Sequence, residues 1–121
     1  MQGVGNLNIN GATVYAADTG YVIHAVGHHP NVRRDALGHG NMIIIRHPTT
    51  GYYTVYSHLQ PGLYVTVGQH VLRGTPIGRV GTSGWSTGFH LHFEIGRGFN
   101  SNTNNLTARE DPINYFNDRS P

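Results

Sequence analysis

The sequence has no cysteine and no lysine among its 121 residues. Without cysteine, disulfide bonds and thiolate metal sites are both excluded. No apolar run reaches the roughly 18 residues that a membrane-spanning helix needs, so no membrane span is expected. Residues 1–6 show neither a basic region nor an apolar core, so no signal peptide is visible at this end.

Charge is also scarce. The sequence has eight arginines and six acidic residues, which gives a formal net charge of +2. The arginines are dispersed apart from Arg33-Arg34, so no nucleic-acid partner is expected. The chain is instead rich in glycine, with 17 residues, and in histidine, with nine. Abundant glycine and few helix-forming runs indicate an all-β chain with many turns, and the length suits one domain over residues 1–121.

The expected strands share apolar runs or period-2 alternation, bounded by turn residues. They cover residues 11–17, 21–26, 42–46, 52–58, 63–67, 76–80 and 90–95. Strands 11–17 and 21–26 are expected to pair as a hairpin, and the apolar run 42–46 is expected in the centre of a sheet. Residues 1–10 are a lead-in, and the Asn-, Ser- and Gly-rich stretch 96–110 is expected to be a surface loop.

The most informative segment is a Gly/Ser/Thr-rich loop that runs into residues 90–95, which alternate between polar and apolar types. Alternation in a strand places His90, His92 and Glu94 on one face. Two histidines two positions apart on a strand lie about 6.6 Å apart, at roughly 3.3 Å per residue. They can converge on a metal ion or on a substrate group between them.

Three segments then combine: Tyr56-Ser57-His58-Leu59, the loop 81–88 and His90-Leu91-His92-Phe93-Glu94. Together with residues 38–41 and 71–78, they resemble the M23 (lysostaphin/LytM-type) zinc metallopeptidases over about residues 11–116. The resemblance implies antiparallel β-sheets with an open groove, the fold called a duplicated hybrid motif. It also implies cleavage of peptide cross-links in bacterial peptidoglycan.

The resemblance assigns roles to three histidines. His92 corresponds to a Zn²⁺ ligand, while His58 and His90 correspond to the residues that orient the attacking water and stabilise the oxyanion. A zinc ion with an open position lowers the pKa of its bound water and polarises the scissile carbonyl. Neutral imidazoles can move a proton or donate to developing negative charge.

Tyr56, Trp85 and Glu94 are predicted to line the substrate groove. Glu94 follows His92 on the same face, where it can hydrogen-bond an imidazole and hold its orientation. Trp85 also suits a plain hydrophobic anchor of its loop, and Tyr56 also suits packing within the sheet.

The first residues of the chain depart from the family pattern. Members carry two further zinc ligands in a His-x-Gly-[Ile/Val]-Asp segment before the first strand. Aligned on Gln2-Gly3-Val4, this chain has Met1 in place of the histidine and Gly5 or Asn6 in place of the aspartate.

Three explanations of this departure stay open. The domain is a degenerate member without metal, or other residues bind the metal, with His28, His29 and His39 as candidates. Otherwise the sequence is a truncated or altered form of an active enzyme. Outside these roles, the remaining histidines are expected to be ordinary polar residues.

Parts of the sequence also resemble two other kinds of domain. The hairpin-like stretch 65–81 suits a biotinyl or lipoyl carrier domain, but such a domain needs a lysine and the chain has none. A sugar-phosphotransfer domain of similar architecture fits the His-Leu-His-Phe-Glu string less well.

The expected partner is bacterial peptidoglycan, with other virion or cell-wall proteins as further partners. The expected location faces the cell wall and is extracellular, periplasmic or virion-associated, and an Asn-rich chain of this size suits a phage origin.

Overall fold

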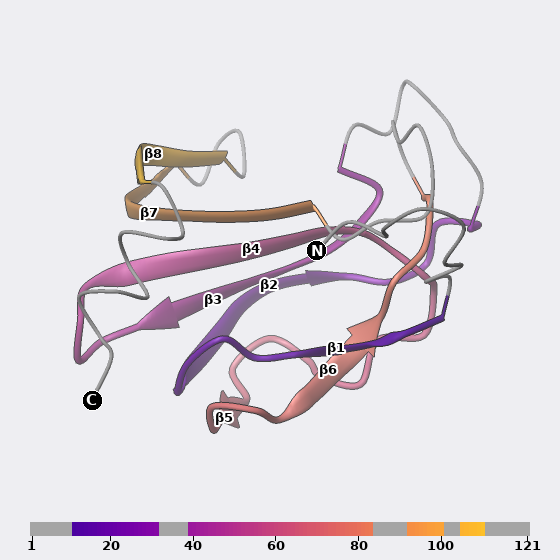
Figure 1. Ribbon diagram of the computed structural model, residues 1–121, viewed down its shortest axis with the longest axis horizontal. Helices are drawn as coiled ribbons and strands as arrows, with labels where there is room; N and C mark the ends of the chain where they lie inside the picture. Colours follow the sequence, from indigo (N-terminus) through magenta and orange to yellow (C-terminus); the bar gives the residue numbers. More distant parts are fainter. Residues whose placement is uncertain (1–10, 32–38, 84–91, 101–104, 111–121) are drawn as a thin grey trace, which may run out of the picture.

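The computed structural model of the chain describes residues 11–31, 39–83, 92–100 and 105–110 (Figure 1). Within these ranges the chain forms β-strands and no helix. The strands are β1 (Thr13–Tyr15), β2 (Gly20–Val26), β3 (Asn41–His47), β4 (Tyr52–Leu59), β5 (His70–Val71), β6 (Pro76–Arg79), β7 (His92–Asn100) and β8 (Asn105–Glu110). Every strand pairing is antiparallel, which confirms the predicted fold class.

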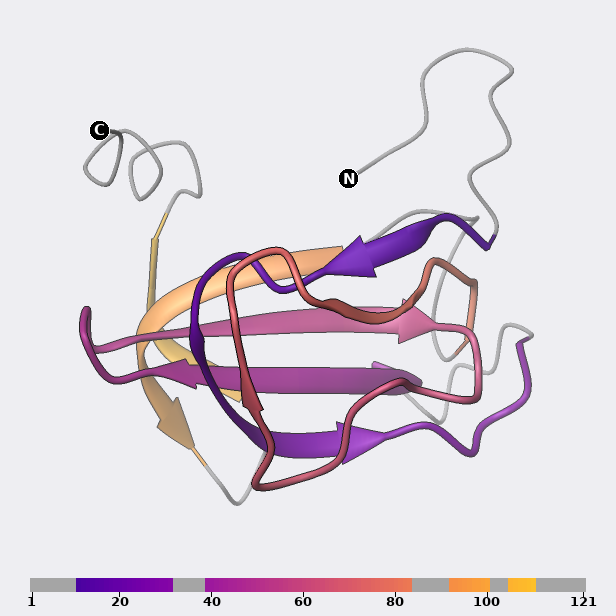
Figure 2. The same cartoon turned by 90° about the horizontal axis from the view of Figure 1, so that it is seen from below.

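The strands form two sheets. β1 pairs with β6, while the larger sheet has the order β5-β2-β3-β4-β7-β8. Figure 1 shows β1 and β6 lying against one face of the larger sheet, and Figure 2 shows the same pair crossing in front of it. We call the face that is turned toward β1 and β6 the inner face and the opposite one the outer face.

Hydrophobic side chains cover both faces of β3, which explains its uninterrupted apolar run. Ile43 and Ile45 belong to the core between the two sheets, whereas Met42 and Ile44 belong to a second cluster on the outer face. A strand that is buried on both sides reads as continuous rather than alternating hydrophobicity. The prediction of a central strand at residues 42–46 is therefore confirmed.

The predicted hairpin between residues 11–17 and 21–26 is wrong, because β1 pairs with β6 and not with β2. The residues between β1 and β2 carry the chain from one sheet to the other. β2 starts at Gly20, whose α-carbon lies so close to the Arg46 carbonyl that a methyl group would collide with it. The local turn signal was real, but it marks a change of sheet.

Two further expectations need correction. Residues 63–67 are not a strand, although Tyr64 donates one backbone hydrogen bond to the Ile77 carbonyl. Residues 96–110 are not simply a loop, because β7 continues to Asn100 and β8 begins at Asn105. Phe99 and Leu106 face each other in that hairpin and pack on the outer-face cluster, so two well-spaced apolar residues outweigh a polar composition. The lead-in 1–10 lies outside the described residues.

A chain of buried hydrogen bonds connects the inner face of β4 to the turn before β2. The Ala17 N–H donates to the Tyr56 hydroxyl, which shares a 2.9 Å hydrogen bond with Thr54. Thr54 Oγ1 lies 2.8 Å from Nε2 of His47, and Nδ1 of that ring donates to the Thr19 carbonyl. These polar groups satisfy one another inside the core, as buried polar groups must.

Candidate functional site

His58 stands at a bulge near the end of β4. Ile43 pairs with Tyr56 and Asn41 pairs with Leu59, so Ser57 and His58 together lie opposite a single β3 residue. A bulge of this kind interrupts the ladder and redirects a side chain. His58 also has φ = 61°, the one positive φ of a non-glycine residue in the described part of the chain.

Hydrogen bonds hold His58 in this conformation. Its backbone N–H donates to the His39 carbonyl at 2.9 Å. Its ring Nδ1 lies 2.8 Å from the Ser83 carbonyl oxygen, which can only accept, so Nδ1 carries the proton. In the neutral ring the lone pair is then on Nε2, the atom that can accept a proton or bind a cation. The side chain is 7% exposed, so the ring is oriented rather than free to rotate.

A buried polar network fixes the residues around His58. Asn41 accepts the His29 N–H, and its amide group donates to the carbonyls of His29 and Leu59. Ser83 accepts the Asn41 N–H and donates to the Leu59 carbonyl at 2.6 Å. Both side chains are fully buried. The loop that ends at Ser83, the start of β3 and the end of β4 are therefore bound into one unit.

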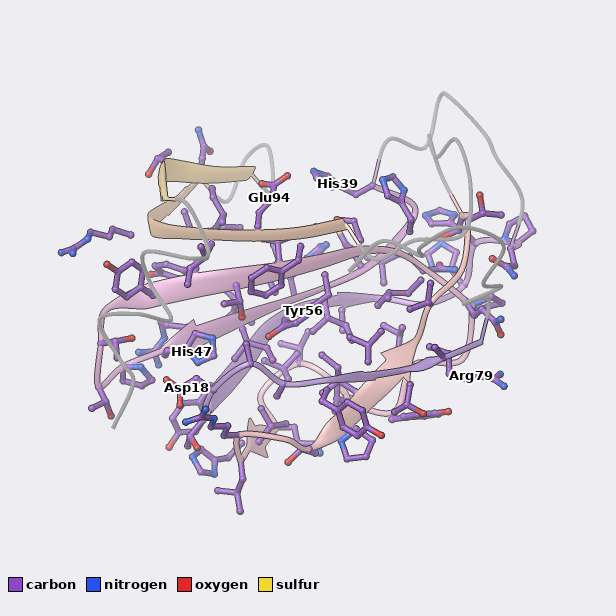
Figure 3. The ribbon with its side chains drawn as sticks, viewed as in Figure 1. Asp18, His39, His47, Tyr56, Arg79 and Glu94 are labelled. Atoms are coloured by element: carbon purple, nitrogen blue, oxygen red, sulfur yellow. The ribbon has the colours of Figure 1, made fainter. Side chains whose placement is uncertain are left out.

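The outer face carries polar residues at both ends of one cross-strand row. His24 is paired with Ile44, Ile44 with Val55, and Val55 with Glu94. Figure 3 shows His39 and Glu94 on this outer side of the larger sheet, and Tyr56 on the inner side. Partial burial, and then the nearby His39, lower the pKa of His24 below its ordinary value.

The structure places the predicted site residues as follows. His92 is the backbone partner of Ser57 in the β4–β7 ladder, directly beside the His58 bulge. Glu94 lies on the outer face of β7, and Phe93 and Ile95 contact the core, as the alternation predicted. His90 and Trp85 lie outside the described residues, so their roles and the groove that they would border stay predictions.

Tyr56 lies in the core rather than on an accessible surface. Its side chain is 1% exposed and packs against the Phe93 ring at a centroid distance of 5.4 Å. Burial raises its pKa to about 12, so the phenol stays neutral at physiological pH. This is the packing role that the sequence left open beside the groove role.

The described side chains do not assemble a metal site. Among the residues whose side chains are described, no group of three or more His, Asp or Glu is placed to hold a metal ion. His92 is the remaining candidate ligand, and residues 1–6 provide no histidine or aspartate. The described residues therefore do not complete a zinc site on their own.

Several residues of the site have no clear functional signal in the sequence. Ser83 belongs to the Gly/Ser/Thr-rich loop, where it was one of several small residues, and Asn41 looked like part of a turn. Asn31 accepts the Thr82 N–H and so anchors the same loop from the β2 side. An Asn or Ser that flanks a buried strand is a weak signal, because turns select the same residues.

Comparison with known proteins finds both sequence relatives and structural neighbours. The model of peptidase family M23 matches residues 2–106. The peptidoglycan DD-endopeptidase ShyC of Vibrio cholerae is 39% identical over 93 residues, covering 75% of this chain and 21% of that protein. ShyB of the same species is 41% identical over 85 residues, covering 70% of this chain and 18% of that protein. The chain thus spans about a fifth of the length of these relatives.

Solved structures give the same answer. Lysostaphin from Staphylococcus simulans superposes with a TM-score of 0.71 at 27% identity, covering 94% of this chain and 42% of that one. A zinc-containing peptidase from Vibrio cholerae superposes with a TM-score of 0.59 at 39% identity, covering 70% and 23%. The family model spans most of the sequence, and these structures share both its fold and its sequence pattern. On this evidence the chain belongs to peptidase family M23.

Proposed function

We propose that this chain is an endopeptidase domain that hydrolyses peptide cross-links in bacterial peptidoglycan. The observation that carries the proposal is the match to family M23 over residues 2–106, together with the identity to peptidoglycan DD-endopeptidases. The site adds support, since His58 is held by a bulge, two hydrogen bonds and a buried network. Packing alone does not require a strained histidine at this point.

In this proposal His58 is a catalytic residue. With the proton fixed on Nδ1, its Nε2 can take a proton from the attacking water, or, once protonated, donate to the oxyanion. His90 is proposed as the second catalytic imidazole. Glu94 and Trp85 are proposed to contact the substrate.

Zinc is proposed as the cofactor, with His92 as a ligand. When bound, zinc would supply a polarised carbonyl and a water of lowered pKa. The departure at Met1 and Gly5 favours a second candidate, a zinc-free module that binds the cell wall or serves as a structural part of a virion. The endopeptidase and the wall-binding module both have peptidoglycan as partner and act where the cell wall is accessible, whereas a structural part of a virion would bind other virion proteins. Among the described residues no helix is long and apolar enough to cross a membrane.

The test incubates the purified chain with isolated peptidoglycan sacculi and follows the soluble fragments by chromatography and mass spectrometry. We expect the cross-linked dimers to decrease and their monomers to increase. His58→Ala should reduce the rate at least about a hundredfold, because general acid–base groups contribute on that order. His70→Ala, an exposed histidine on β5, is the matched control and should keep the wild-type rate.

Two outcomes would count against the proposal. If the chain sediments with sacculi but releases no fragments, it is the wall-binding module instead. If His58→Ala cleaves as fast as wild type, hydrolysis does not use the site described above.

A further inference from the structure

His39 contacts both residues of the β4 bulge. Its carbonyl oxygen accepts the His58 N–H at 2.9 Å, and its ring Nδ1 lies 2.8 Å from the Ser57 hydroxyl. Ser57 is fully buried, so this hydroxyl has no access to bulk water. Residue 39 therefore holds two consecutive residues of β4, one through its backbone and one through its ring.

The backbone contact matters because of the bulge. Ser57 and His58 face only Met42 across the β3–β4 ladder, so the regular pattern of backbone hydrogen bonds is interrupted there. The His58 N–H is satisfied by His39 instead. Losing that acceptor would leave a buried donor unpaired and remove one restraint on a strained φ.

The ring contact determines whether the acceptor stays in place. Gly40 follows His39 with φ = 63°, a conformation that gives the chain a sharp change of direction. Beyond it, Asn41 is locked by its own hydrogen bonds to Ser83 and Leu59. The ring bond to Ser57 is the side-chain restraint on the other side of that glycine.

We propose that His39 is a positioning residue, whose ring bond to Ser57 keeps its carbonyl on the His58 amide and so orients the His58 imidazole. The catalytic meaning of this orientation rests on the proposed function. The mechanical part, a coupling between the residue 39 ring and the His58 backbone, holds for the folded chain without substrate.

Four variants separate the ring bond from other roles of the histidine. His39→Ala and Ser57→Ala each remove the hydrogen bond from one side. His39→Asn retains a polar atom near the position of Nδ1 but removes Nε2, so it can restore the bond to Ser57 and nothing more. His70→Ala is the control for a general effect of losing a histidine.

The first measurement is hydrogen exchange of the His58 amide by NMR in the substrate-free protein. The exchange rate should rise about five- to tenfold in His39→Ala and in Ser57→Ala, the effect of losing one hydrogen bond on local opening. The double variant should show no larger increase than either single one, and His39→Asn and His70→Ala should match wild type. An unchanged rate in both His39→Ala and Ser57→Ala would overturn the proposal.

The second measurement is peptidoglycan cleavage by the same variants. His39→Ala should lower kcat about tenfold with little change in KM, and His39→Asn should restore it. If His39→Asn has normal exchange but remains as slow as His39→Ala, then Nε2 acts directly on the substrate or a metal, and the positioning role is wrong. If wild type does not cleave at all, the proposed function fails, while the exchange data still decide the role of His39.

Discussion

The backbone of His58 is the residue-scale feature that most needs a functional explanation. A left-handed conformation costs a non-glycine residue about 1–2 kcal/mol, and such residues persist where surrounding contacts hold them. Here the His39 and Ser83 carbonyls bind His58 itself, and the buried Asn41 side chain holds the carbonyl of the next residue, Leu59. Together they fix the orientation of the ring: Nδ1 is bound to the Ser83 carbonyl, and Nε2 is left with the lone pair.

His24 offers a pH-dependent test at the same scale. Its pKa is lowered in the folded chain, by partial burial and then by His39, so the unfolded chain binds this proton more readily. The resulting contribution to stability is complete above the ordinary pKa of 6.5, and it is lost as the pH falls from there through the lower pKa of the folded chain. Wild type should therefore lose more stability than His24→Gln on acidification from about pH 8 to about pH 5.

Urea unfolding of both proteins at several pH values measures this difference. The other eight histidines are the same in the two chains, so the comparison isolates residue 24 together with its interaction with His39. Equal losses of stability on acidification would show that the folded chain does not disfavour protonation of His24.

At the scale of elements, the segment from Gly81 to Ser83 positions the site. A methyl group on Gly81 would collide with Asn31 Oδ1 and lie 2.7 Å from the Gln60 nitrogen, a backbone atom that cannot move aside. Gly81→Ala should lower the free energy of unfolding by about 2–3 kcal/mol, typical of overpacking. It should also release Ser83 from His58 and slow peptidoglycan cleavage.

Gly78→Ala is the matched control, since its added methyl group meets Leu59 and Leu63 at an ordinary 3.6 Å. We expect it to change the stability by less than about 1 kcal/mol. Urea denaturation of the two variants decides the matter, and an equal effect would mean that the close approach at Gly81 does not restrain the loop.

The β7–β8 hairpin is stabilised by the outer-face cluster. Leu106 is 4% exposed and packs with Met42, Ile44 and Val55. Leu106→Ala should lower the free energy of unfolding by about 2–4 kcal/mol, whereas Leu72→Ala, at a position 62% exposed, should change it by less than about 0.5 kcal/mol. Thermal unfolding of both variants measures these losses. Similar small losses would mean that packing of Leu106 does not stabilise the β7–β8 hairpin.

The strands that the sequence predicted well are marked by apolar runs and by turn residues next to them. The apolar run 42–46 and the strand 52–58 are joined by a turn at residues 48–51, and both lie in the centre of the larger sheet. The pairing of β1 with β6 had no local signal, because the two strands are far apart in the sequence. The turn signal between β1 and β2 therefore predicts a hairpin that the chain does not form.

The candidate site was predicted to a similar extent. His58 and the strand of His92 were found from a motif, and the structure puts them side by side. The network of Asn41, Ser83 and His39 has no comparable motif, because its contacts join the start of β3, the end of β4 and the segment at Ser83, which are remote from one another in the sequence. Sequence patterns show the types of residue that chemistry needs, and tertiary contacts show how those residues are held.

At the scale of the whole molecule, the larger sheet has two different faces. The inner face packs on β1 and β6 around Ile43, Tyr56 and Leu59. The outer face is apolar under the β7–β8 hairpin and carries His39 and Glu94 elsewhere (Figure 3). The larger hydrophobic cluster therefore lies on the inner face, while the outer face combines a smaller cluster with the polar residues His39 and Glu94.

The most direct measurement incubates the purified chain with a defined cross-linked muropeptide dimer and follows the dimer by mass spectrometry. Parallel samples contain added zinc, a chelator, or the chelator followed by excess zinc. We predict that wild type hydrolyses the dimer to two monomers with zinc, that the chelator stops the reaction and that zinc restores it. His92→Ala should stay inactive in every sample. A dimer that stays intact with folded wild-type protein and excess zinc would contradict the proposed endopeptidase activity.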